Sequence, residues 1–149
     1  MTDTLQAILL AAVVSGTLDA AAAVTQAATL GMNPQRVFQG VASGLLGSRS
    51  FERGWNSGAL GVVLHFVIAC IISAIYVLAS LHLPFLLRHP FIAGGLYGIA
   101  VFVVMFFIVL PLSRRPKRPF NRNFAATQLL IHIVIIGWSI ALSARYILR

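Results

Sequence analysis

Four long apolar blocks constrain this chain more than any other feature of its sequence. A helix needs about 20 mostly apolar residues to cross a hydrocarbon core of roughly 30 Å, and each block reaches that length. The alternation of β-barrel strands is absent, because runs such as Val101 to Leu110 are apolar on every side. We therefore predict an all-α fold, a four-transmembrane-helix bundle that forms one domain over residues 1–149. The predicted helices cover residues 4–31, 57–81, 91–112 and 124–148.

The charged residues lie between and beyond these blocks. They make up 9% of the chain, whereas soluble proteins carry about 25%. The net charge of +8 comes without a basic stripe interleaved with aromatic residues, so nucleic acid is not an expected partner. Anionic phospholipids are the expected partners of this charge. The predicted headgroup contacts are Arg36, Arg114, Arg115, Lys117 and Arg118.

The distribution of Lys and Arg predicts the orientation in the membrane. The first and third connecting loops together hold eight of these residues, and the opposite side holds three. Because short cytoplasmic loops are enriched in Lys and Arg, both loops should be cytoplasmic and both termini periplasmic. The first block should be a retained helix and not a signal peptide, since Met1 to Gln6 contain Asp3 and no Lys or Arg.

The first loop contains a further predicted helix, at about residues 34–46. Asn33 can cap its first turn, and Gln39 falls away from its apolar side. We interpret the segment as a short cytoplasmic interfacial helix between helices one and two. Gly40 and Gly44 should let it lie close against another helix. Its predicted apolar face consists of Val37, Phe38, Val41 and Leu45.

A few polar and ionisable residues interrupt the apolar blocks, and they lie at similar depths. At a rise of about 1.5 Å per residue, His65 and His132 each lie about 12 Å from the predicted cytoplasmic end of their helices, and Asp19 about 18 Å. Ionisable groups in a bilayer usually face the bundle interior or water. We therefore predict a ligand or proton site near the midplane. Its candidate residues are Asp19, His65, Gln128 and His132.

Four interpretations of this cluster remain open. The side chains could be structural and hold the helices together by hydrogen bonds. They could relay a proton or an ion, because His titrates near neutral pH. Two His and one carboxylate could hold a divalent metal, although no metal-ligand spacing occurs within one helix. His65 and His132 could also be the axial ligands of a b-type haem.

The third helix contributes small residues in place of polar ones. Gly94 and Gly98 form a G-x-x-x-G pattern, which permits close helix packing. No nucleophile elbow, P-loop or G-x-G-x-x-G motif occurs in the chain, so we predict no catalytic residues and expect a non-enzymatic protein. The expected role is an accessory, scaffolding or assembly component of a larger membrane complex or a homo-oligomer. The alternative is a proton-, metal- or haem-binding protein of transport or electron transfer.

Several short segments of the chain carry a family resemblance. They are Gly16 to Asp19, Pro34 to Gly47, Leu60 to Phe66, Gly95 to Gly98, Pro111 to Ser113 and Leu130 to His132. These segments resemble a family of small, uncharacterised four-helix bacterial inner-membrane proteins. The resemblance implies a four-helix fold in the bacterial cytoplasmic membrane and implies no activity.

Overall fold

The four predicted membrane-spanning helices are present. The computed structural model describes residues 2–117 and 119–149, and this part of the chain is helical with no strand. It thus confirms an all-α chain, and the helix boundaries differ from the predicted ones by at most three residues. Arg118, a predicted headgroup contact, lies outside the described residues. The helices that are long and apolar enough to cross a membrane are Asp3–Thr29, Gly54–His82, Pro90–Leu112 and Arg122–Leu148.

The first two spans are continuous α-helices, whereas the third and fourth each contain a π-helical segment. The first and second spans are α1 (Thr2–Thr29) and α3 (Gly54–His82). The third consists of α5 (Pro90–Val104), the π-helix η2 (Met105–Val109) and α6 (Leu110–Leu112). The fourth consists of α7 (Arg122–Ile131), the π-helix η3 (His132–Gly137) and α8 (Trp138–Leu148). The connections contain α2 (Gln35–Leu46), the 3₁₀ helix η1 (Gly47–Glu52) and α4 (Pro84–Arg88).

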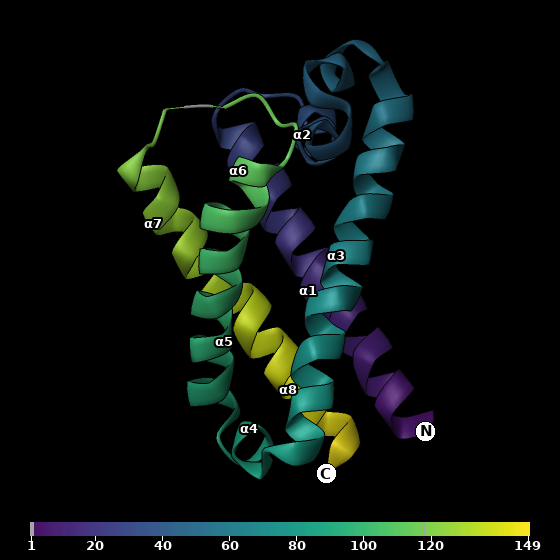
Figure 1. Cartoon of the computed structure of the whole chain (residues 1–149), viewed down its shortest axis with the longest axis vertical. Coiled ribbons are helices and arrows are strands. Elements are labelled where there is room, and N and C mark those ends of the chain that lie inside the picture. Colours follow the sequence, from purple (N-terminus) through teal and green to yellow (C-terminus); the bar gives the residue numbers. More distant parts are fainter. Residues whose placement is uncertain (1, 118) are drawn as a thin grey trace.

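The connecting segments gather at opposite ends of the molecule. Helices α2 and α6 and the beginning of α7 lie at one end, and α4 and both termini lie at the other (Figure 1). The backbone N–H of Arg114 donates a hydrogen bond to the carbonyl oxygen of Gly44 over 2.9 Å. The two basic loops therefore share one end of the molecule.

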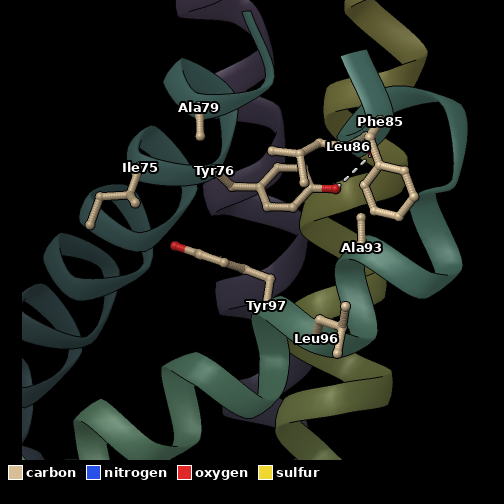
Figure 2. A pocket seen from close by; sticks show the side chains of 8 residues that line it. All are labelled: Ile75, Tyr76, Ala79, Phe85, Leu86, Ala93, Leu96 and Tyr97. Atoms are coloured by element: carbon tan, nitrogen blue, oxygen red, sulfur yellow. Dashed lines mark hydrogen bonds between the residues drawn. The ribbon is translucent and has the colours of Figure 1, made fainter. Parts of the chain in front are cut away.

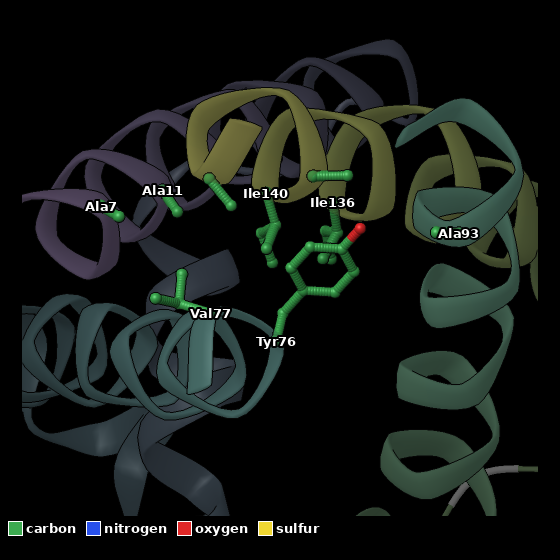
Figure 3. Packing of buried hydrophobic residues seen from close by; sticks show 9 residues of the cluster. Ala7, Ala11, Tyr76, Val77, Ala93, Ile136 and Ile140 are labelled. Carbon is green, nitrogen blue, oxygen red and sulfur yellow. The ribbon is translucent and has the colours of Figure 1, made fainter. Parts of the chain in front are cut away.

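Small side chains form much of the buried core. Helix α1 packs against α3 and α8, and α5 packs against η3 and α8. Figure 3 shows Ala7 and Ala11 of α1 facing Ile140, while the Tyr76 ring lies beside Ile136. Alanines on facing helices permit a close approach, which favours van der Waals packing between membrane helices.

The contact between the third and fourth spans depends on three glycines. A β-carbon at Gly98 would overlap the carbonyl oxygen of His132, and one at Gly94 would lie 2.6 Å from the carbonyl oxygen of Gly137. A β-carbon at Gly137 would in turn overlap the Gly94 carbonyl. The G-x-x-x-G pattern of α5 thus lies directly on the backbone of η3.

Helix α2 is held to α3 by buried polar groups. The Gln39 amide donates to the Gly54 carbonyl over 3.1 Å, and the Ser50 hydroxyl donates to the Gln39 carbonyl. The Ser57 hydroxyl donates to the Ser50 carbonyl over 2.6 Å. Each of these three polar side chains is at most 4% exposed. These bonds fix the α2–η1–α3 turn.

The structure shows which face of this helix is buried, and it corrects one expectation about its glycines. Gln39 faces α3, whereas Leu45 is 53% exposed, so the buried face of α2 is the polar one. A β-carbon at Gly40 would meet no described atom within 4 Å outside its own helical turn, so Gly40 does not mediate packing. The close contact comes from the other helix, because a β-carbon at Gly61 of α3 would overlap the carbonyl oxygen of Phe38. An amide can bury itself here because backbone carbonyls and hydroxyls satisfy it.

Candidate functional site

Asp19 is the central residue of the candidate site. It lies on α1 and is half-buried. Its carboxylate interacts electrostatically with both His65 and His132. Among the described residues it forms no hydrogen bond and no direct ion pair. An ionisable carboxyl in the middle of a spanning helix therefore has two basic neighbours and no fixed partner.

His65 joins α3 to α1. Its Nε2 donates a hydrogen bond to the carbonyl oxygen of Gly16 over 2.8 Å. The ring lies edge-on to Phe66, with centroids 5.4 Å apart, and to Phe38 of α2, with centroids 6.5 Å apart. With Nε2 as the donor, a neutral ring presents Nδ1 as an acceptor. His65 thus has a fixed orientation and one nitrogen that can accept a proton.

His132 is the first residue of the π-helix η3. Its Nδ1 donates to the Gln128 carbonyl oxygen over 2.7 Å, and its ring lies edge-on to Phe102 of α5 with centroids 5.6 Å apart. This bond makes Nε2 the acceptor of a neutral ring. π-Helical turns are frequent at functional sites. The turn here places an ionisable side chain opposite α1.

Gln128 connects the cluster to one end of the molecule. Its side-chain Nε2 donates to Oε1 of Gln26 over 3.0 Å, which joins α7 to α1. Gln128 lies four residues before His132 and Gln26 lies seven residues after Asp19, so the bridge is on the side of α2. The structure thus places the predicted residues on three adjoining helices.

The arrangement is unfavourable for the two cofactor interpretations. Within residues 2–117 and 119–149, no three His, Cys, Asp or Glu side chains come close enough together to hold a metal ion. For a haem, Nε2 of His65 would have to be available, but it is directed at the Gly16 carbonyl. Aromatic rings from α2 and α3 also flank His65. These contacts hold the His65 ring in place between α1, α2 and α3.

Two buried hydroxyls extend the polar region away from the glutamine bridge. Ser15 of α1 is 1% exposed and Ser73 of α3 is fully buried. Neither hydroxyl oxygen has a hydrogen-bond partner within the described part of the chain. Ser15 lies one helical turn before Asp19, and Ser73 two turns after His65. Both hydroxyls therefore lie between the ionisable cluster and the end of the molecule that carries the two termini.

A separate cavity of about 260 Å³, which no sequence pattern indicated, lies between α3, α4 and α5. Figure 2 shows Tyr76 and Tyr97 beside it, together with apolar side chains of all three helices. The Tyr76 hydroxyl donates to the Leu86 carbonyl over 3.0 Å, and the Tyr97 hydroxyl to the Ile72 carbonyl over 2.6 Å. Because both hydroxyls donate to the backbone, this cavity offers little to a polar ligand.

The predicted headgroup contacts lie near the end of the molecule that carries α2. Arg36, Arg114 and Lys117 are exposed, and Arg115 is half-buried. The Arg36 guanidinium lies 6.0 Å from the centroid of the Phe51 ring. Contact of these residues with lipid stays a prediction.

Four apolar helices that can cross a membrane define a multi-pass membrane protein. No family model, curated protein or solved structure matches the chain. The resemblance to small bacterial inner-membrane proteins therefore stays a prediction, and any function has to be argued from the side chains described above.

Proposed function

We propose that this protein takes up a proton at Asp19 inside the membrane and passes it through His65 and His132. The observation that carries the proposal is the environment of Asp19. Its carboxyl interacts with two histidines and forms no hydrogen bond within the described residues. A charged Asp at the centre of a spanning helix costs roughly 2.5–3.5 kcal/mol on the insertion scale. Proton uptake cancels that charge, so protonation changes the energetics of this position strongly.

The two histidines suit proton exchange with Asp19. Each uses one ring nitrogen to bond a backbone carbonyl, which fixes the ring, and each neutral ring has its second nitrogen as an acceptor. A proton that leaves the Asp19 carboxyl can therefore be accepted at Nδ1 of His65 or Nε2 of His132.

Polar groups on both sides of the cluster extend this route. The Gln26–Gln128 bridge lies toward the end with α2. The buried hydroxyls of Ser15 and Ser73 lie toward the end with the termini. Water molecules that bridge buried polar groups can complete such chains.

The proposal is tested by the infrared spectrum of the protein as pH changes. The chain has only three Asp and Glu residues, namely Asp3, Asp19 and Glu52, so carboxyl bands can be assigned by substitution. We expect a carboxyl band that responds to pH and disappears in Asp19→Asn. The matched control is Glu52→Gln, which removes an exposed carboxyl near α2. A spectrum of Asp19→Asn identical to that of the natural sequence would rule out proton exchange at this residue.

We infer a second candidate role, that of an accessory or assembly subunit, from the outer face of α1. Thr17, Ala21, Thr25 and Thr29 recur every four residues and are all exposed. Small residues at this spacing are typical of faces on which membrane helices associate. The two roles are separable, because Asp19→Asn removes proton uptake and leaves this face unchanged.

Both roles require an orientation, and we propose that the end with α2 is cytoplasmic in the bacterial inner membrane. The support is the positive-inside bias together with the contact between the two basic loops. A cysteine at Asn121, in a Cys70→Ala background, should be protected from an impermeant thiol reagent in intact cells. A cysteine at Arg88, at the end with the termini, should be labelled. The reverse pattern would reverse the orientation.

A further inference from the structure

A second surface cavity lies between α1 and α8, at the end with the termini. Its volume is about 530 Å³. It is distant in sequence from the basic loops and takes no part in the proton route proposed above. The residues that line it are Leu10, Val14, Leu142, Ser143, Arg145, Tyr146 and Arg149.

The lining of this cavity changes from apolar to basic along α8. Leu142 lies deeper in the span, and Arg145 and Arg149 lie toward the end of the helix. At a rise of 1.5 Å per residue the distance from Leu142 to Arg149 is about 10 Å. On α1 the lining residues are Leu10 and Val14, which are both apolar. The cavity therefore has an apolar floor within the membrane and a basic mouth near its surface.

The mouth carries a positive charge that is held in place. Nη1 of Arg145 donates to the carbonyl oxygens of Leu87 and Arg88, over 3.2 and 3.0 Å. These acceptors are neutral, so they orient the guanidinium without cancelling its charge. A guanidinium has five N–H donors, which leaves donors for a ligand. Arg149 is exposed beside it.

We propose that this cavity binds one anionic phospholipid from the leaflet at the end with the termini. The phosphate lies between Arg145 and Arg149, and an acyl chain lies along Leu10, Val14 and Leu142. Tyr146 is 78% exposed, and aromatic side chains of this kind favour the headgroup level of a bilayer. A second copy that docks symmetrically through this same face does not suit the cavity, because it would bring the same positive groups to the mouth.

The test measures the thermal stability of the purified protein in an uncharged detergent during a titration with lipid. Dioleoylphosphatidylglycerol should raise the melting temperature more than dioleoylphosphatidylcholine, since ligands that bind the native state stabilise it. Arg149→Gln should weaken the apparent affinity for phosphatidylglycerol about fivefold, because one basic residue near a membrane surface contributes about that factor. Arg53→Gln, an exposed change at the opposite end, is the matched control and should leave the affinity unchanged.

A second pair of variants tests the apolar floor. Val14→Trp should fill the cavity and abolish the effect of phosphatidylglycerol, whereas Val13→Trp, on the neighbouring exposed position, should not. If Val14→Trp does not fold, the comparison of Arg149→Gln with Arg53→Gln tests the proposal. Equal effects of the two lipids, or equal losses in Arg149→Gln and Arg53→Gln, would overturn the proposal. Full stabilisation by glycerol phosphate alone would also overturn it, because the acyl chain would then contribute nothing.

Discussion

Gly98→Ala is expected to destabilise the protein by about 3 kcal/mol or more, at the upper end of the cost of overpacking a core. The added methyl group would overlap the carbonyl oxygen of His132 and lie 2.8 Å from Cα of Ile133. Both are backbone atoms of η3, so no side-chain rotation can relieve the overlap. The third and fourth spans must then move apart. Reversible unfolding in mixed micelles measures the change in the free energy of unfolding.

Gly95→Ala provides the control within the same helix. Its β-carbon would lie 3.7 Å from Nε1 of Trp138 and 3.9 Å from Cγ2 of Ile133, which are ordinary van der Waals distances. We expect a change of less than about 1 kcal/mol, the size of the difference in helix propensity between Gly and Ala. Equal losses of stability in the two variants would show that the backbone contact at Gly98 is not what holds α5 to η3.

The positions of the helices and part of their packing could be predicted from the sequence. Apolar length alone located the four spans, because the bilayer fixes the length that a helix needs. Asn33 could be recognised as a cap, and its side chain accepts a hydrogen bond from the Gln35 N–H over 2.9 Å. The pattern of Gly94 and Gly98 indicated a close contact, but not which helix would make it.

Features that depend on three-dimensional contacts could not be predicted in this way. The burial of Gln39 depends on partners 11 and 15 residues further along the chain. The Ser50 hydroxyl of η1 donates to the Gln39 carbonyl, and the Gly54 carbonyl of α3 accepts from the Gln39 amide. The π-helix η3 has no sequence pattern of its own, although it begins at His132 and therefore affects the candidate site. The fixed position of Arg145 has no sequence pattern either, since its bonds to the α4 carbonyls arise from the packing of α8 against α4.

For the candidate site, the depth of each residue along its helix was the most informative feature of the sequence. It placed Asp19, His65 and His132 at a common level, and the structure gives the Asp19 carboxyl an electrostatic interaction with each histidine. Depth could not show how the rings are oriented. The bonds from His65 to Gly16 and from His132 to Gln128 fix the two rings, and each bond occupies one ring nitrogen with a backbone carbonyl.

Asp19→Asn is expected to abolish proton movement through the protein while leaving it folded. In vesicles that contain a trapped pH-sensitive dye, a potassium diffusion potential should drive protons inward faster through the natural sequence than through protein-free membrane. The amide has nearly the shape of the carboxyl but cannot take up and release a proton at neutral pH. The rate in Asp19→Asn should therefore fall to the leak of protein-free vesicles.

Three further variants show whether this measurement is specific to the candidate site. Glu52→Gln removes the same charge from an exposed position in η1 and should leave the rate unchanged. His132→Phe keeps a ring that can pack against Phe102 but removes both nitrogens, so the rate should fall while the helices stay together. His65→Phe also loses the bond to the Gly16 carbonyl, which should lower stability as well as rate. If Asp19→Asn conducts protons as fast as the natural sequence, the carboxyl does not carry them, and its histidine neighbours then serve to hold α1 against α3 and η3.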